Sequence, residues 1–221
     1  GTSLAGGKSS LSPLEKLGKK IFFDESLSIN ENQACATCHA PEVGFTGPRD
    51  DFNAAGAVYE GSIPGAFGER KPPSSAYATL APRFYADFGN RMVDENEADL
   101  ANDPLFVGGN FSDGRATGWK LGNPAADQSQ GPFLNPVEQA LPDRACVVYR
   151  VCEGEYAGLF DEVWSPNRCV ITWPEDVEYQ CTQIGGAVAL SPQDRNKVNG
   201  AYDRVALSIA AFEGSVESNA F

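Results

Sequence analysis

Five residues, Cys-Ala-Thr-Cys-His at positions 35–39, constrain this chain more than any other feature. Cys35 and Cys38 are separated by two residues, and His39 is the only histidine among 221 residues. C-x-x-C-H is the attachment motif of c-type haem. Two thiols one helical turn apart can add to the two vinyl groups on one porphyrin edge, and the next imidazole then reaches the iron. The motif predicts one covalent haem c, bound by Cys35 and Cys38, with His39 as the proximal iron ligand.

Two other uses of the cysteine pair compete with haem attachment. A redox-active disulfide usually lies in a βαβ setting, which the surrounding sequence does not predict. A zinc site needs four ligands, and the other cysteines, spaced five and eleven residues apart, do not form a second pair of the required kind. Haem attachment is therefore the favoured interpretation.

The remaining four cysteines, Cys146, Cys152, Cys169 and Cys181, lie in a short segment rich in turn residues and aromatics. Their even number predicts two disulfides and an oxidising compartment, with four buried free thiols as the alternative. Pairing Cys146 with Cys152 and Cys169 with Cys181 closes the smallest loops, but the sequence allows three pairings.

Charge and hydropathy exclude several classes of partner. The chain has 30 acidic and 17 basic side chains, a formal charge of −13, which disfavours nucleic acid. No apolar run approaches the roughly 20 residues of a membrane span. The segment GTSLAGGKSS at the start does not have the pattern of a signal peptide, so we expect an exported protein whose signal has been removed.

Helix signals stand at both ends of the chain. Ser191 and Pro192 predict the start of a long helix whose apolar positions from Val198 to Phe212 recur at helical period, and Gly214 predicts its end. Ser12, Pro13 and Glu15 predict a shorter first helix. We expect further short helices at 156–164 and after Pro136. Residues 40–135 are rich in Gly, Pro, Asn and Asp, which predicts long irregular loops around a ligand.

The flanking segments add a family resemblance. LGKKIFFDESLS precedes the haem motif, CATCHAPEVGFTG contains it, and FSDGRA and DQSQGPFLNPVEQA follow. In this order they resemble the N-terminal half of the bacterial di-haem cytochrome c peroxidases, a family that includes a branch oxidising tryptophans of a partner protein. The resemblance implies a mainly α, cytochrome c-like haem domain with long irregular loops, formed by residues 1–221. It also implies hydrogen peroxide as substrate.

The resemblance also implies site residues. Gln128 occupies the family's glutamine position and Glu138 the glutamate position of its N-P-x-E element. A carboxylate can take a proton from one peroxide oxygen and return it to the other, and an amide can hold the peroxide without titrating. An isolated Glu138 in such a segment would otherwise be a first-turn helix carboxylate. Arg115 is a candidate partner for a haem propionate, or an exposed loop arginine.

Four departures from the family pattern qualify these expectations. The chain has one C-x-x-C-H instead of two, so we expect the second haem domain to be absent from it. The stretch 58–70 has no distal histidine, which leaves the iron open or bound by Met92, the only methionine. Ser112 replaces a tryptophan on the path between the haems, for which Trp119 is a possible substitute. Lys71 stands at a calcium-binding asparagine position, which makes calcium doubtful.

Two functions of different classes follow from this reading. The first is a haem peroxidase domain that takes electrons from a donor cytochrome or a second haem domain, and oxidation of a partner protein is a variant of it. The second is a non-catalytic electron-transfer cytochrome or a unit of a multi-haem assembly. Gln128, Glu138 and the missing distal histidine favour the first, whereas the single haem motif and Ser112 favour the second.

Overall fold

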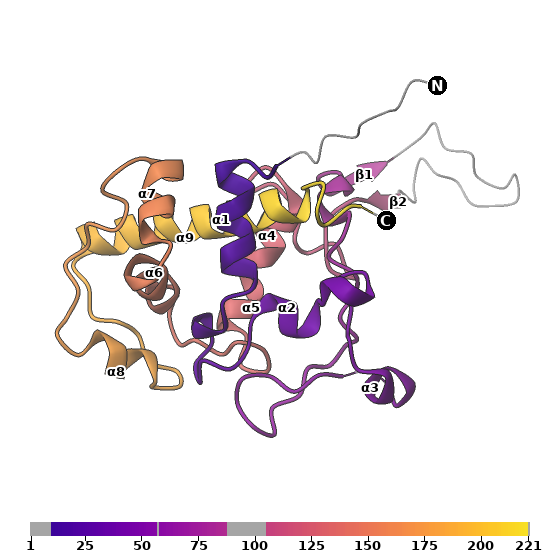
Figure 1. The fold of residues 1–221 in the computed structure, drawn as a ribbon, viewed down its shortest axis with the longest axis horizontal. Helices are drawn as coiled ribbons and strands as arrows, with labels where there is room; N and C mark the ends of the chain where they lie inside the picture. Colours follow the sequence, from indigo (N-terminus) through magenta and orange to yellow (C-terminus); the bar gives the residue numbers. More distant parts are fainter. Residues whose placement is uncertain (1–9, 57, 88–104, 221) are drawn as a thin grey trace, which may run out of the picture.

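The computed structural model describes residues 10–56, 58–87 and 105–220 (Figure 1). The long helix α9 (Pro192–Glu213) runs through the molecule, and α1 (Pro13–Phe22) crosses it. Helices α4 (Pro124–Ser129) and α6 (Arg144–Glu153) also pack on α9. The mainly α fold predicted from the sequence is confirmed.

Both terminal helices begin where the sequence predicted. The Ser12 hydroxyl accepts a hydrogen bond from the Glu15 amide, and the Glu15 carboxylate accepts one from the Ser12 amide, which completes a capping box. At α9 the Ser191 hydroxyl accepts from the Asp194 amide at 3.1 Å. These side chains replace the partners that the first amides of a helix lack.

Helices α1 and α9 touch backbone to backbone at Gly18. A Cβ atom placed on Gly18 would lie 1.8 Å from the carbonyl oxygen of Ser208. Any side chain at this position would therefore separate the two helices. Around the crossing, Phe22 and Phe212 pack edge to face with 5.3 Å between ring centroids, and Phe45 completes the aromatic cluster.

The remaining elements are short and are joined by irregular segments. The other α-helices are α2 (Cys35–Cys38), α3 (Asp50–Ala54), α5 (Gly131–Leu134), α7 (Ala157–Trp164) and α8 (Val177–Cys181). The 3-10 turns are η1 (Glu25–Leu27), η2 (Pro41–Val43) and η3 (Ala78–Leu80), and the antiparallel strands are β1 (Tyr85–Asp87) and β2 (Leu105–Val107), with Tyr85 opposite Val107. The predicted long loops are confirmed for the part of 40–135 that the structure describes.

The helix expected after Pro136 is absent from the structure. Residues 136–139 form a turn, in which the Asn135 side chain accepts from the Val137 amide at 3.3 Å. Ala140 then adopts a left-handed conformation with φ 61°, which stops a right-handed helix. The next helix, α6, begins only after the cap at Asp143, whose carboxylate accepts from the Ala145 amide. The predicted helix at 156–164 is confirmed as α7.

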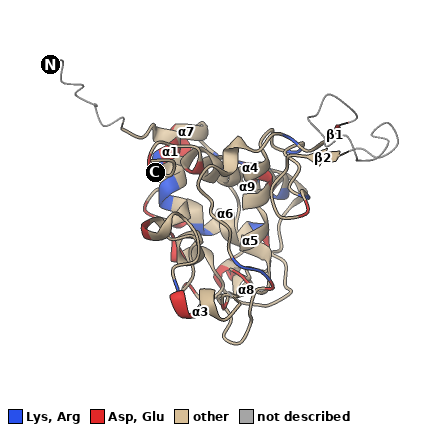
Figure 2. Cartoon of the chain, turned by 90° about the vertical axis from the view of Figure 1, so that its right-hand side faces the viewer, with Lys and Arg blue, Asp and Glu red and all other residues tan. Residues whose placement is uncertain are grey.

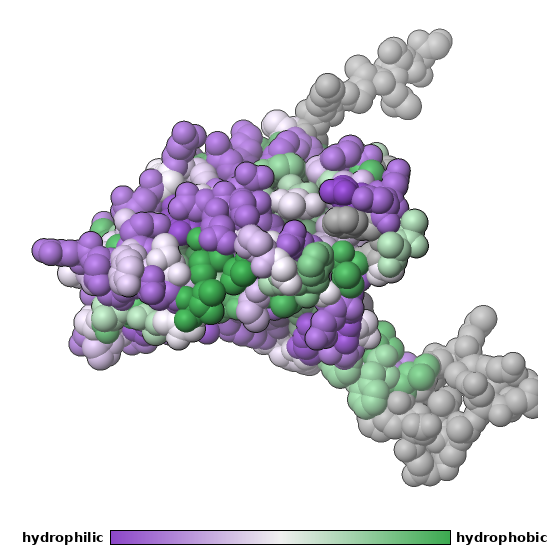
Figure 3. Space-filling view, turned by 90° about the horizontal axis from the view of Figure 1, so that it is seen from below, coloured by the Kyte–Doolittle hydropathy of each residue, from purple (hydrophilic) through white to green (hydrophobic). Residues whose placement is uncertain are grey.

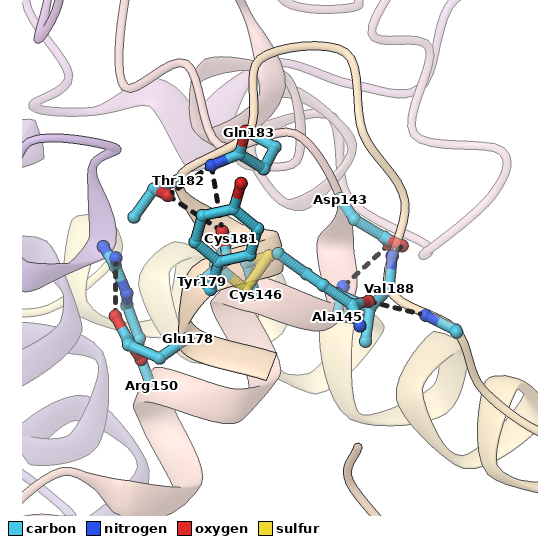
Figure 4. Close-up of a disulfide and its surroundings, with 12 residues drawn as sticks. Asp143, Ala145, Cys146, Arg150, Glu178, Tyr179, Cys181, Thr182, Gln183 and Val188 are labelled. Atoms are coloured by element: carbon cyan, nitrogen blue, oxygen red, sulfur yellow. Dashed lines mark hydrogen bonds and ion pairs between the residues drawn. A yellow bond between two sulfur atoms is a disulfide. The ribbon is translucent and has the colours of Figure 1, made fainter. Parts of the chain in front are cut away.

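Two disulfides close the segment that holds α6, α7 and α8, as Figure 4 shows for one of them. The bonds join Cys146 to Cys181 and Cys152 to Cys169. The prediction of two disulfides is confirmed, but the pairing that closes the smallest loops is wrong. Cys146 and Cys152 both lie on α6, about 9 Å apart along its axis, so they cannot bond to each other.

The surface carries mixed charges over most of the described residues. Figure 2 shows Lys and Arg interspersed with Asp and Glu, with a basic stretch on α1 that includes Lys19 and Lys20. Seen from below, the molecule is mainly hydrophilic, with hydrophobic residues gathered near the middle of that face (Figure 3). None of the helices described is long and apolar enough to cross a membrane.

Candidate functional site

The cysteine pair is displayed by α2, which is a single helical turn. The Thr37 hydroxyl accepts from the Ala34 amide at 3.0 Å and starts the turn, and the His39 amide donates to the Cys35 carbonyl at 3.0 Å and ends it. Positions three apart in a helix share one face, so Cys35 and Cys38 point to the same side. His39 follows immediately as the C-cap, with φ -126° and ψ 68°.

His39 is held by backbone carbonyls from two irregular segments. Its Nδ1 donates to the carbonyl of Pro73 at 2.9 Å and lies 3.2 Å from the carbonyl of Phe45. Carbonyls only accept, so the proton resides on Nδ1 and the lone pair on Nε2. Burial lowers the pKa of His39 despite these two bonds, so the ring is neutral at neutral pH. This is the tautomer and charge state that an iron ligand requires.

Cys35 and Cys38 are free thiols, whereas the other four cysteines are bonded in pairs. Burial, followed by the nearby Glu138 carboxylate, raises the pKa of Cys38 to about 11. Burial also raises the pKa of Cys35. A redox-active pair needs a lowered thiol pKa, so this environment disfavours that use. Within the described ranges, no cluster of three or more potential metal-ligating side chains supports a zinc site.

These residues fit haem c. Two unpaired cysteines lie one turn apart, and the neighbouring imidazole has Nδ1 engaged and Nε2 free. Gln33 contacts the cysteine pair. Its Nε2 lies 3.8 Å from the Cys38 sulfur and donates to the Glu60 carbonyl at 3.1 Å. When bound, the haem would supply a redox-active iron beside His39.

Glu138 lies close to the cysteine pair. Its carboxylate raises the pKa of both thiols, and its Oε2 accepts from the Asn135 amide group at 3.0 Å. Burial raises the pKa of Glu138, although the Asn135 bond and the charge of Arg115 act in the opposite direction. The side chain is thus a partly desolvated carboxyl that keeps its proton to a higher pH than an ordinary glutamate does.

The loop that lacks a distal histidine packs directly on the turn of Glu138. The Ser62 amide donates to the Glu138 carbonyl at 2.7 Å. A Cβ atom on Gly61 would lie 2.5 Å from the Val137 carbonyl oxygen, so glycine permits this close approach. The loop therefore fixes the backbone of Glu138.

Arg115 makes its contacts with neighbouring residues of its own loop. Its Nη1 contacts both carboxylate oxygens of Asp113 at 2.9 Å, and its guanidinium stacks 3.7 Å from the centre of the Phe111 ring. Its charge acts against the rise in the pKa of Glu138 that burial causes. Ser112 accepts from Arg70 Nη1 at 2.6 Å. Arg115 as a propionate partner stays a prediction.

The other predicted residues lie apart from these contacts. Gln128 is half-buried on α4, and no bond between it and Glu138 is found among the described residues, so its role stays a prediction. Trp119 is exposed and donates to the Phe84 carbonyl at 2.9 Å. Met92 lies outside the described residues. Lys71 is exposed, and the expectation about calcium stays untested.

Three residues of this region were missed by sequence reasoning. Pro73 and Gln33 act through contacts that only the fold creates. Glu213, the last residue of α9, is 5 % exposed, and its charge raises the pKa of Cys35. Its one signal in the sequence is a carboxylate at the end of an otherwise apolar helix face, where burial is costly.

Comparisons with known proteins agree with this geometry. The chain is 39 % identical over 138 residues to the methylamine utilization protein MauG of Paracoccus denitrificans, covering 62 % of this chain and 30 % of MauG. The diheme peroxidase BthA of Burkholderia thailandensis superposes with a TM-score of 0.65 and 24 % identity, over 95 % of this chain and 40 % of BthA. A tyrosine-to-methionine variant of BthA gives a TM-score of 0.67 and 25 % identity, over 94 % and 40 % of the two chains.

The chain therefore spans 30–40 % of the length of these relatives. The mainly α fold is that of diheme peroxidases, and haem c is the cofactor that the family implies. A family model described as di-haem cytochrome c peroxidase matches residues 12–220, which is nearly the whole chain. This protein belongs to the di-haem cytochrome c peroxidase family.

Proposed function

We propose that this chain is a haem c-dependent peroxidase domain that reduces hydrogen peroxide to water, using electrons from a partner haem or cytochrome. The observation that carries the proposal is Glu138, a partly desolvated carboxyl beside Cys35 and Cys38. An electron carrier has no need of a titratable carboxyl at this position, whereas peroxide reduction needs a group that moves a proton.

Each of the site residues has a separate role in the proposed reaction. Cys35 and Cys38 hold one haem covalently, and His39 binds its iron through Nε2. Gln128 holds the peroxide by hydrogen bonds. The Glu138 carboxylate takes the proton from one peroxide oxygen and delivers it to the departing oxygen. One peroxide consumes two electrons from the donor and two protons, and two water molecules leave.

The absence of a distal histidine supports direct access of peroxide. His39 is the only histidine of the sequence, so no second imidazole of this chain would be available to bind the iron of a haem held here. Peroxide then does not have to displace a strong ligand from this chain, and reductive activation through a second haem is unnecessary for binding.

Electron transfer without catalysis is the second candidate function. It is favoured by Ser112, which bonds Arg70 at the position where the family has a tryptophan between its haems. Absorption and EPR spectra of the ferric protein, before and after peroxide, distinguish the two. The peroxidase predicts a high-spin ferric signal that changes on addition of peroxide. A low-spin, six-coordinate iron that peroxide leaves unchanged would support the electron carrier instead.

We also propose that the protein is exported to the periplasm or the cell surface. The support is the pair of disulfides together with a haem attachment motif, because disulfides persist in oxidising compartments. Unreduced, denatured holoprotein should show no reactive thiol, since four cysteines are bonded to one another and two to haem. Four reactive thiols would contradict the oxidised state.

A further inference from the structure

Glu213 is a buried carboxyl that the proposed peroxidase mechanism does not use. It is the last residue of α9 and is 5 % exposed. Its Oε2 is buried and has no hydrogen-bond partner among the described residues. Burying an ionised carboxylate with an unpartnered oxygen is costly, so this oxygen of Glu213 calls for an explanation.

The environment of Glu213 favours the neutral acid. Burial raises its pKa to about 8, and burial is the one cause of this shift. The carboxyl also lies at the C-terminal end of α9, where the helix carbonyls disfavour negative charge. Lys19 of α1 does not neutralise it, because that ammonium pairs with the exposed carboxylate of Glu217.

Cys35, the cysteine that would carry the haem, packs against the same hydrophobic cluster as Phe212, the residue before Glu213. Burial and then the charge of Glu213 raise the pKa of Cys35 of α2, whose thiol would become a neutral thioether on haem attachment. The preceding residue, Phe212, packs with 6.1 Å between ring centroids against Phe45, whose carbonyl contacts Nδ1 of His39. Glu213 is therefore within electrostatic reach of a haem bound at this site.

We infer that Glu213 is a redox-linked proton-binding site of the haem. A ferric haem core carries one positive charge more than a ferrous core, so it favours the ionised form of Glu213 more strongly. On reduction, one electron from a donor enters the haem and one proton from solvent binds the Glu213 carboxylate. On oxidation both leave. The group thereby keeps the charge of the buried region constant, and it couples the midpoint potential of the haem to pH.

This inference rests on haem attachment at Cys35, which belongs to the proposed function, and not on peroxide reduction. The experiment is a spectroelectrochemical titration of the holoprotein with one-electron mediators across neutral and mildly alkaline pH. The midpoint potential of the wild type should fall with rising pH, by up to about 59 mV per unit, the tenfold step of a one-electron couple. Glu213→Gln should abolish this slope, with a potential near the low-pH limit of the wild type.

One comparison variant isolates the effect. Glu217→Gln removes an exposed carboxylate of the same C-terminal segment and should keep the wild-type slope. Redox-difference infrared spectra should contain the carbonyl band of a carboxylic acid that forms on reduction in the wild type and is missing in Glu213→Gln.

The outcomes separate this inference from the proposed function. A preparation without covalent haem would contradict haem attachment itself. With haem present, a flat wild-type curve, an unchanged slope in Glu213→Gln, or loss of the slope in Glu217→Gln would overturn the role of Glu213. If Glu213→Gln does not assemble with haem, Glu213→Asp replaces it. That variant keeps a carboxyl and should shift the pH range of the slope, and an unchanged curve would overturn the inference.

Discussion

The Pro73 carbonyl sets the tautomer and the orientation of the His39 ring. Its bond to Nδ1 leaves Nε2 as the free nitrogen, so the ring is oriented before any iron is bound. The sequence predicted His39 from the motif alone, because covalent haem attachment has a fixed residue spacing. It could not predict Pro73, which lies 34 residues away and contributes only a backbone atom.

Glu138 is the residue on which the proposed chemistry depends. Replacing it by glutamine removes the titratable group but keeps its size and its hydrogen bond with Asn135. Glu138→Gln should slow the spectral reaction with peroxide by about 10²–10⁴-fold, the usual cost of losing a general acid–base. Stopped-flow absorbance measures this rate. Cyanide binding to the same iron is the control, since it does not require proton delivery to a leaving oxygen, and equal losses in both reactions would point to a disrupted pocket.

The pH dependence of the same reaction follows from the direction of the Glu138 shift. Burial raises its pKa, and the base is active only when ionised. The rate with peroxide should therefore rise as pH increases through this raised pKa. As pH falls, the rate should be lost at a higher pH than it would be with an ordinary glutamate. Glu138→Gln should lack this limb. A wild-type profile that is flat over the range would contradict the assignment.

At the scale of elements, the crossing of α1 and α9 depends on a glycine. Gly18→Ala improves helix propensity but places a methyl group against the Ser208 carbonyl. Because the clash is with backbone, its cost should exceed the gain in helix propensity. The substitution should lower the free energy of unfolding by about 3 kcal/mol. Chemical denaturation measures this change.

Gly158 of α7 provides the matched control for that substitution. It is exposed, and no atom lies within 4 Å of an added Cβ. Gly158→Ala should therefore stabilise the protein by about 0.5–1 kcal/mol. Two glycine-to-alanine changes in helices should thus have opposite signs, and a stabilised Gly18→Ala would contradict the observed crossing.

The two helices that combine a start signal with one apolar face were predictable from the sequence, whereas α6 has a cap at Asp143 but no such face. Helices α1 and α9 carry Ser-Pro starts, which act locally. Helix α6 was missed, because its buried residues surround the axis instead of forming one face: Ala145, Cys146, Val147, Val148, Arg150 and Val151. The disulfide pairing was missed for a related reason, since it depends on where α8 packs on α6.

At the scale of the whole molecule, the chain is shorter than its relatives and carries fewer haem motifs than the family name implies. The relatives named above are two to three times longer, and the family is di-haem, whereas this sequence carries one C-x-x-C-H motif. Under the proposed function, we expect electrons to reach the haem at Cys35 and Cys38 from a group outside residues 1–221. The formal charge of −13 favours a basic docking surface on a donor protein.

The central claim is that Cys35, Cys38 and His39 hold a single haem c, on which every functional proposal depends. The most direct measurement is the intact mass of the denatured protein. Denaturation releases a haem bound only through iron, whereas thioether bonds survive. The expected mass of the wild type is that of the 23.6 kDa chain plus one haem, and after Cys35→Ala combined with Cys38→Ala it is that of the chain alone. A wild-type mass equal to that of the bare chain would contradict the claim.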